Sequence, residues 1–143
     1  MASPTNQRGL RDTNLASNAA LLPNAANTVN SNSVDLGIAT PYAITEKVAV
    51  LIATTAGTGA NSKNINIALH ESSDNSSWAN MANLGIPPHC QLVDNASVAS
   101  TYAATNFRLT LPPSVKRYIR AGATGEANGG NAGGGTFTLS LCF

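Results

Sequence analysis

Short segments in which every second residue is apolar recur along this chain of 143 residues. The clearest is residues 64–70 (NINIALH), where Ile65, Ile67 and Leu69 alternate with polar or small residues. Successive side chains of an extended strand point to opposite faces, so these three would share one face. Such a pattern predicts a β-strand with one buried face and argues against the 3.6-residue stripe of a surface helix.

Other segments predict further strands. Residues 47–54 (KVAVLIAT) are nearly all apolar, which is typical of a strand buried on both faces. We predict no helix beyond a short turn around residues 15–22, because no longer segment has helical periodicity. About eight short strands at this spacing indicate an all-β sandwich or jelly roll. The remaining strands are expected around Val34 and Leu36 and at residues 92–98, 106–111, 116–121 and 136–143.

Turn-forming residues separate the predicted strands. Asp74 and Asn75 lie in residues 71–78 (ESSDNSSW), and both types tolerate left-handed backbone and bond their own main chain, which predicts a hairpin tip. The glycine-rich residues 122–135 could suggest a phosphate-binding loop, but that loop needs Gly-Lys-Ser/Thr opening a helix. No lysine follows here and a predicted strand comes next, so we expect a flexible hairpin loop.

Residues 1–27 differ from the rest because they are rich in Ala, Asn, Ser and Thr and show no clear periodicity. Two interpretations remain open. The segment could be a poorly ordered terminus, or an extended arm that becomes ordered on a neighbouring subunit. We therefore predict an N-terminal arm over 1–27 and an antiparallel β-sandwich domain over 28–143, and we expect the fold to survive deletion of residues 2–27.

The surface is expected to carry little charge. Charged residues make up 10% of the chain, against about 25% in an ordinary soluble domain, and the net charge is +1. The basic patch that marks nucleic-acid binding is therefore not expected. A surface so poor in charge lacks one normal defence against association, which favours contact with other proteins.

The sequence also bears on location. No apolar stretch resembling a secretory signal is visible near the N-terminus, and the longest apolar run, residues 48–53, is far shorter than the roughly 20 residues of a membrane helix. We therefore expect synthesis in a cytoplasm and no membrane partner. Cys90 and Cys142 are then expected to be reduced, buried thiols, and the N-x-S sequences at Asn75 and Asn95 carry little weight.

The chain offers few residues for catalysis or metal binding. His70-Glu71 and His89-Cys90 are the only pairs of this kind, and a zinc site needs three or four converging ligands. A polar residue at a strand end and a small buried thiol explain them better. No Ser-His-Asp set has a reason to converge. We expect no enzyme activity, no catalytic or metal-binding residues and no cofactor.

Two further features suggest contacts with partners. Trp78 could stack on a sugar, although a lone tryptophan at the start of a strand more often anchors a core. In residues 116–120 (KRYIR), alternation would place Lys116 and Arg120 on one side of a strand and Arg117 on the other. This arrangement could protect a sheet edge by charge, or it could form a basic strip that meets acidic groups on a partner.

Several segments resemble one known family. Residues 30–37 (NSNSVDLG) resemble the S-x-N-x-I-D-L-G first-strand motif of small tailed-phage capsid-stabilising proteins, also called cement or decoration proteins. The last part of the chain is also similar to that family in the order and spacing of its segments. These segments are residues 111–112 (LP), residues 117–120 (RYIR), a glycine-rich loop and the strand TFTLSL. The similar segments cover about half of the chain.

The resemblance implies an eight-stranded antiparallel jelly-roll sandwich that binds the outside of a phage capsid. The expected function is a structural virion protein that cements neighbouring major capsid proteins, assembles as a homo-oligomer with a dimer favoured over a trimer, and is made in the bacterial host cytoplasm. The family has no catalytic residues to carry over. The candidate capsid contacts in this chain are Arg8, Arg11, Leu15, Lys116 and Arg120.

Two alternatives from other classes stay open. The first is a receptor- or glycan-binding β-sandwich module of a phage tail or fibre, which the hairpin ending at Trp78 could support. The second is a cellular β-sandwich that binds an unidentified partner.

Overall fold

The computed structural model describes residues 11–23, 27–39, 48–58, 64–81, 84–93, 101–125 and 135–142. Within them there are thirteen strands and no α-helix. The strands are β1 (Arg11–Ala16), β2 (Ala20–Leu21), β3 (Thr28–Asn30), β4 (Val34–Asp35), β5 (Ala49–Thr54), β6 (Gly57–Thr58), β7 (Ile65–Ser72), β8 (Ala79–Asn80), β9 (Cys90–Leu92), β10 (Thr101–Tyr102), β11 (Thr105–Thr110), β12 (Tyr118–Gly125) and β13 (Thr136–Cys142).

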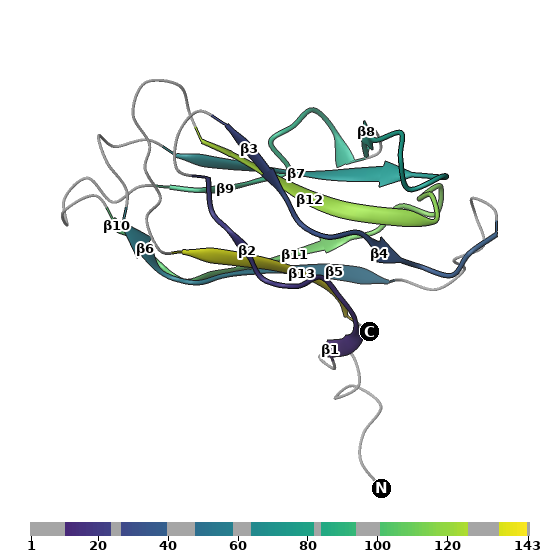
Figure 1. Ribbon diagram of the computed structural model, residues 1–143, viewed down its shortest axis with the longest axis horizontal. Helices are drawn as coiled ribbons and strands as arrows, with labels where there is room; N and C mark the ends of the chain where they lie inside the picture. The colour runs from purple at the N-terminus through teal and green to yellow at the C-terminus, as the bar shows by residue number, and fades with distance from the viewer. Residues whose placement is uncertain are drawn as a thin grey trace, which may run out of the picture.

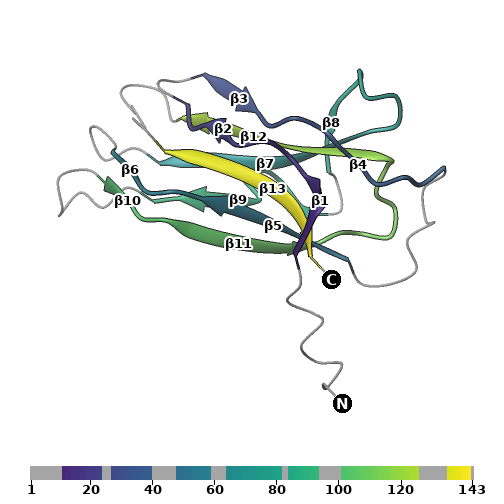
Figure 2. The ribbon, with the colours of Figure 1, turned by 60° about the horizontal axis from the view of Figure 1, so that its bottom comes forward.

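The strands form two antiparallel sheets that lie one above the other (Figures 1 and 2). The first sheet has the order β1-β13-β5-β11, and β2 also pairs with β13. The second sheet has the order β3-β12-β7-β8, with β4 also on β12 and β9 also on β7. A short third ladder, β6 with β10, continues the β5–β11 pair beyond its end. The predicted all-β fold with antiparallel sheets is confirmed.

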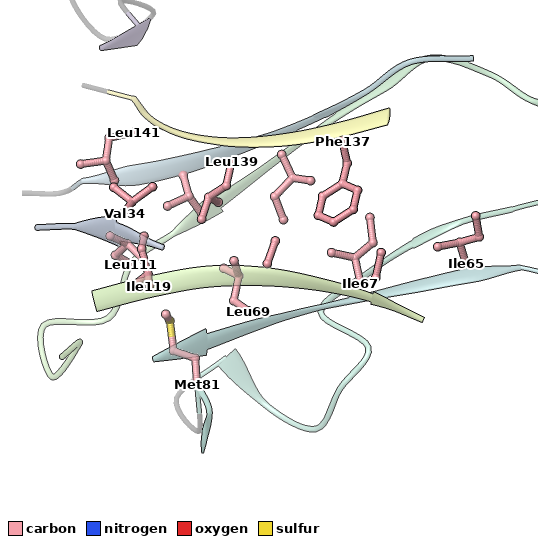
Figure 3. Packing of buried hydrophobic residues seen from close by; sticks show 14 of the residues in the cluster. Val34, Ile65, Ile67, Leu69, Met81, Leu111, Ile119, Phe137, Leu139 and Leu141 are labelled. Carbon is pink, nitrogen blue, oxygen red and sulfur yellow. The ribbon is translucent and has the colours of Figure 1, made fainter. Parts of the chain in front are cut away.

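Alternating apolar side chains fill the space between the sheets (Figure 3). On β7, Ile65, Ile67 and Leu69 are all buried, as the period of two predicts. They face apolar residues of β13 in the other sheet, and Phe137 is the largest side chain that is completely buried. Burial of such side chains stabilises a fold by about 1.5–3 kcal/mol each. The other members of the core include Val50, Ile52, Met81, Leu111, Val115, Ile119, Leu139 and Leu141.

Serine side chains keep the hydrogen-bond ladder intact where the outer strands are interrupted. Between β1 and β2, Ser17 donates its N–H to the carbonyl of Leu139 (2.7 Å), and the Leu139 N–H donates to the Ser17 hydroxyl (2.9 Å). Just after β3, Ser31 makes the same pair of bonds with Ala121, at 2.8 and 3.0 Å. In both places a hydroxyl takes the position of a backbone carbonyl. Neither N–H is left buried without an acceptor.

Most predicted strands are found. The segments 47–54, 64–70, 106–111 and 136–143 correspond to β5, β7, β11 and β13. The strand predicted at 116–121 instead starts at Tyr118 and runs to Gly125, into the region predicted as a loop. Of the strand predicted at 92–98, only Leu92, the end of β9, is in a strand, and 94–98 lie outside the described residues, as do 126–134 of the glycine-rich loop.

The expected boundary between arm and sandwich at residue 28 is wrong. β1 and β2 pair with β13, and Leu22 is buried in the core with 3% of its surface exposed. The sandwich therefore already includes residues 11–23. The short helical turn predicted at 15–22 is also wrong, because those residues complete the first sheet. Residues 1–10 lie outside the described residues.

Candidate binding face on the second sheet

The outer face of the second sheet carries polar side chains from β12 and β7. These strands pair along eight residues, with Arg120 opposite His70 and Thr124 opposite Asn66. Their neighbours in the sequence point into the core, so these four point away from it. The Thr124 hydroxyl also bonds the hydroxyl of Thr28 on β3, at 2.7 Å. We call this surface, centred on Arg120, His70 and Thr124, the outer face.

Trp78 joins this face from the turn that precedes β8. The guanidinium carbon of Arg120 lies 4.3 Å from the centre of the Trp78 ring, within the range of a cation–π contact. Trp78 is half-buried and does not belong to the core cluster, so its interpretation as a core anchor is wrong. Instead the ring packs against the guanidinium group of Arg120. This contact joins two elements that the sequence separates widely.

Arg120 and His70 have no acidic partner among the described residues. Arg120 Nε and His70 Nδ1 are both buried without a hydrogen bond to any of these residues. Burial lowers the pKa of Arg120 from its ordinary value. Burial also lowers the pKa of His70, and the nearby charge of Arg120 lowers it further. His70 is therefore neutral at pH 7, while Arg120, whose ordinary pKa is 12.5, keeps its charge.

Gly122 lets these side chains lie close to the sheet. A Cβ atom at this position would be 2.6 Å from His70 Cε1 and 2.8 Å from Asn30 Oδ1. Both distances are shorter than real contacts allow, so a larger residue would push the His70 ring or the Asn30 amide away. The glycine is therefore needed for the present arrangement of the outer face.

Next to Gly122 the outer face is hollowed. The hollow has a volume of about 200 Å³, which is smaller than the roughly 300–1,000 Å³ of a site for a drug-sized molecule. It suits a single side chain better than a free ligand. It is lined by Asn66, Ile67, Ala68, Pro87, Pro88 and Thr124.

His89 holds the loop beside this hollow. Its Nδ1 accepts the N–H of Leu69 at 2.8 Å, and its Nε2 lies 3.4 Å from the carbonyl of Gly85. The loop presents Ile86, whose surface is 92% exposed. His89 is thus a structural residue that ties this loop to β7. Among the described residues, no three His, Cys, Asp or Glu side chains come together to hold a metal ion.

Of the predicted basic strip, Arg120 lies on β12, whereas Lys116 lies before the strand. The Lys116 N–H donates to a carboxylate oxygen of Glu71 (3.1 Å) at the end of β7. Arg117 is also outside the strand, and its Nε and Nη2 donate to the two carboxylate oxygens of Asp35, both at 2.8 Å. This contact and the N–H of Gly37 lower the pKa of Asp35. Only Arg120 of the three cations belongs to the outer face.

The other candidate contacts lie elsewhere. Leu15 is partly buried and packs against the core, which leaves little of it for a partner. Arg11 is the first residue of β1, and Arg8 lies outside the described residues.

No sequence signal pointed to the pairing of Trp78 with Arg120. A tryptophan in a turn and an arginine on a distant strand become neighbours only through the β7–β12 register.

The two cysteines are free thiols in different sheets. Burial raises the pKa of Cys90 to about 12, so its thiol stays protonated and unreactive at neutral pH. Cys142 is buried on β13, whereas Cys90 is only partly buried. Asn75 of the first N-x-S sequence lies at the exposed hairpin tip with a φ of 59°, and Asn95 of the second lies outside the described residues.

Comparisons with known proteins yield no relative: a scan against protein-family models found no match, and neither did a search of curated proteins. In the described part of the chain there is also no helix of the length and apolarity needed to cross a membrane.

Proposed function

We propose that this chain is a structural virion protein that binds the outside of a tailed-phage capsid and cements neighbouring major capsid proteins. The observation that carries the proposal is that two segments resembling the cement proteins are neighbours in the fold. Residues 30–37 include β4, which pairs with β12 at the RYIR segment. Asp35 of the first segment binds Arg117 of the second through two hydrogen bonds.

A jelly-roll topology is part of this proposal. If β1–β2, β3–β4, β5–β6, β8–β9 and β10–β11 each count as one interrupted strand, eight strands remain. The first then pairs with the eighth, the second with the seventh, the third with the sixth and the fourth with the fifth. A hairpin folded back in this nested order and rolled into two sheets is the jelly roll seen in viral capsid domains. The strand order supports this topology.

Such a scaffold would act by adding buried area between capsid subunits that otherwise hold weakly. A standard protein interface buries about 1,600 Å² in total, and a homo-oligomer that engages several subunits gains avidity without new chemistry. We propose that this chain forms a homodimer rather than a homotrimer in this role. A contact that works by area alone needs no catalytic centre and no cofactor, and we propose neither.

The direct test is co-sedimentation of the purified protein with capsids of the phage that encodes it, stripped of this protein. We expect saturable binding that makes the capsids more resistant to heat. Capsids of an unrelated phage serve as the control. If the protein stays in the supernatant with its own capsids at every concentration, the proposed function is wrong.

A glycan-binding module remains the second candidate, because Trp78 is partly exposed on a sheet face. One face of its ring is already covered by Arg120, which leaves less aromatic surface for a sugar to stack on. A glycan array separates the two functions. Strong binding to one glycan class that Trp78→Ala removes would favour the glycan-binding module over the capsid protein.

A further inference from the structure

We propose that the outer face binds a carboxylate group of a partner protein through Arg120. Under the proposed function, which this inference deepens, the partner is the major capsid protein. The site consists of Arg120, the Trp78 ring packed against it and His70 opposite it on β7, with the hollow farther along the same two strands.

The first argument is the charge of the outer face. Arg117, three residues away, has both carboxylate oxygens of Asp35 as partners, whereas Arg120 has no acidic partner among the described residues. His70 lies opposite Arg120 and adds no negative charge. An arginine that is held in place and lacks a counter-ion favours a ligand that brings one. Carboxylates match the planar fork of the guanidinium group.

The second argument is the fixed position of the cation. The Trp78 ring supports the guanidinium group at 4.3 Å, so less side-chain entropy is lost when a ligand binds. Because Nε is buried, a ligand would meet the two Nη nitrogens. These can bind both oxygens of one carboxylate. Arginine and tryptophan are also the residues found most often at the energetic centres of protein interfaces.

The third argument concerns the kind of ligand. The hollow holds about 200 Å³ and is rimmed by Pro87 and Pro88, and the same loop exposes Ile86 almost completely. A small, largely apolar hollow on the same pair of strands as a fixed cation fits the surface of a protein, which brings apolar contacts together with charged groups. An acidic sugar would instead need a larger polar site and a free aromatic face. The features therefore favour a protein carboxylate.

The test uses nuclear magnetic resonance on the labelled full chain, with sodium N-acetylglutamate whose α-carboxyl is blocked as the methylamide as the probe and the neutral α-methylamide of N-acetylglutamine at matched ionic strength as the control. We expect the Arg120 Nε–H and Trp78 indole N–H signals to shift saturably with the acid only. Arg120→Gln should abolish the shift. Arg117→Gln, which removes a cation already paired with Asp35, should leave the shift unchanged.

Arg120→Lys keeps the charge but loses the fork, and we expect it to weaken probe binding severalfold while the spectrum stays that of a folded protein. If the acid and the neutral probe shift the same signals equally, the inference is wrong. It is also overturned if N-acetylneuraminate, a carboxylated sugar, binds more than about tenfold tighter than the blocked glutamate probe, since the ligand would then be an acidic glycan.

Capsid binding separates this inference from the proposed function. Arg120→Gln should raise the protein concentration needed for half-occupancy more than about tenfold, because a hydrogen-bonded charge pair is lost. If wild type and Arg120→Gln decorate capsids equally, the carboxylate site is wrong and the capsid function stands. If wild type does not bind capsids, the proposed function fails, and the probe titration still decides the site.

Discussion

At the scale of single residues, hydroxyl groups replace backbone carbonyls in the ladders of this fold. Ser17 and Ser31 do so where outer strands are interrupted, and Thr55 does the same with Thr136 beyond the end of β5, with bonds of 2.9 and 2.8 Å. A small hydroxyl side chain can bond nearby backbone groups in this way without a large change in the chain path. The many Ser and Thr residues of the chain therefore have a structural role in addition to keeping the surface hydrated.

This role gives a direct prediction for Ser31. Ser31→Ala removes the acceptor of the buried Ala121 N–H, and an unsatisfied buried donor costs about 1–3 kcal/mol. We expect the free energy of unfolding to fall by that amount, measured by urea denaturation. Ser73→Ala, at an exposed position of the hairpin tip, is the matched control and should change little. Equal stability of the Ser31 and Ser73 variants would contradict the role assigned to the hydroxyl.

At the scale of elements, the β7–β8 hairpin depends on one carboxylate. Asp74 accepts the N–H groups of Ser77 and Ser76 and the hydroxyl of Ser72, and these bonds lower its pKa far below the ordinary 3.8. Because the folded pKa is depressed, the stabilisation is present above pH 3.8 and is lost as the pH falls through the folded value. The protection of the Ser76 and Ser77 amides against hydrogen exchange, relative to their intrinsic rates, should therefore be the same at pH 3 as at neutral pH.

Asp74→Asn provides the comparison for this hairpin. The asparagine side chain cannot titrate, so in this variant we expect the protection of the Ser76 and Ser77 amides, relative to their intrinsic exchange rates, to show no step in acid. In the wild type, carbon-detected nuclear magnetic resonance can follow the carboxyl carbon of Asp74 as the pH falls. If this carboxyl group titrates at an ordinary pKa, the hydrogen bonds described for this turn are contradicted.

The N-terminal strands give a second prediction at this scale. Deleting residues 2–23 removes β1, β2 and the buried Leu22, and leaves one edge of β13 without its partners. We expect this variant to be insoluble or strongly destabilised in thermal denaturation. Deleting residues 2–10 keeps every described contact and should leave the melting temperature unchanged. If the longer deletion melted like wild type, β1 and β2 would not belong to the fold.

The comparison of sequence and structure also belongs to this scale. β5, β7, β11 and β13 could be predicted because each has at least six residues and apolar side chains that are buried or partly buried at regular positions. β2 and β3 could not, because they have only two and three residues, and β1 could not, because its sequence RDTNLA has no alternating apolar residues. The contact between Trp78 and Arg120 depends on tertiary register, which no local pattern in the sequence records.

At the scale of the whole molecule, the two sheets enclose one apolar core and leave a polar outer face with an unpaired cation among the described residues. A rigid sandwich can hold such a face in a fixed orientation, as a protein that joins capsid subunits requires. The proposed capsid role and the proposed carboxylate site therefore require the same orientation of the molecule on the capsid. The second sheet, not the first, should point toward the capsid.

Electron cryomicroscopy of capsids decorated with the purified protein tests this account most directly. We predict density for a two-layer β-sandwich between neighbouring major capsid proteins on the outer surface, with Trp78 and Arg120 at the interface and a capsid carboxylate within hydrogen-bond distance of Arg120. Capsids that carry no such density at saturating protein would contradict the account.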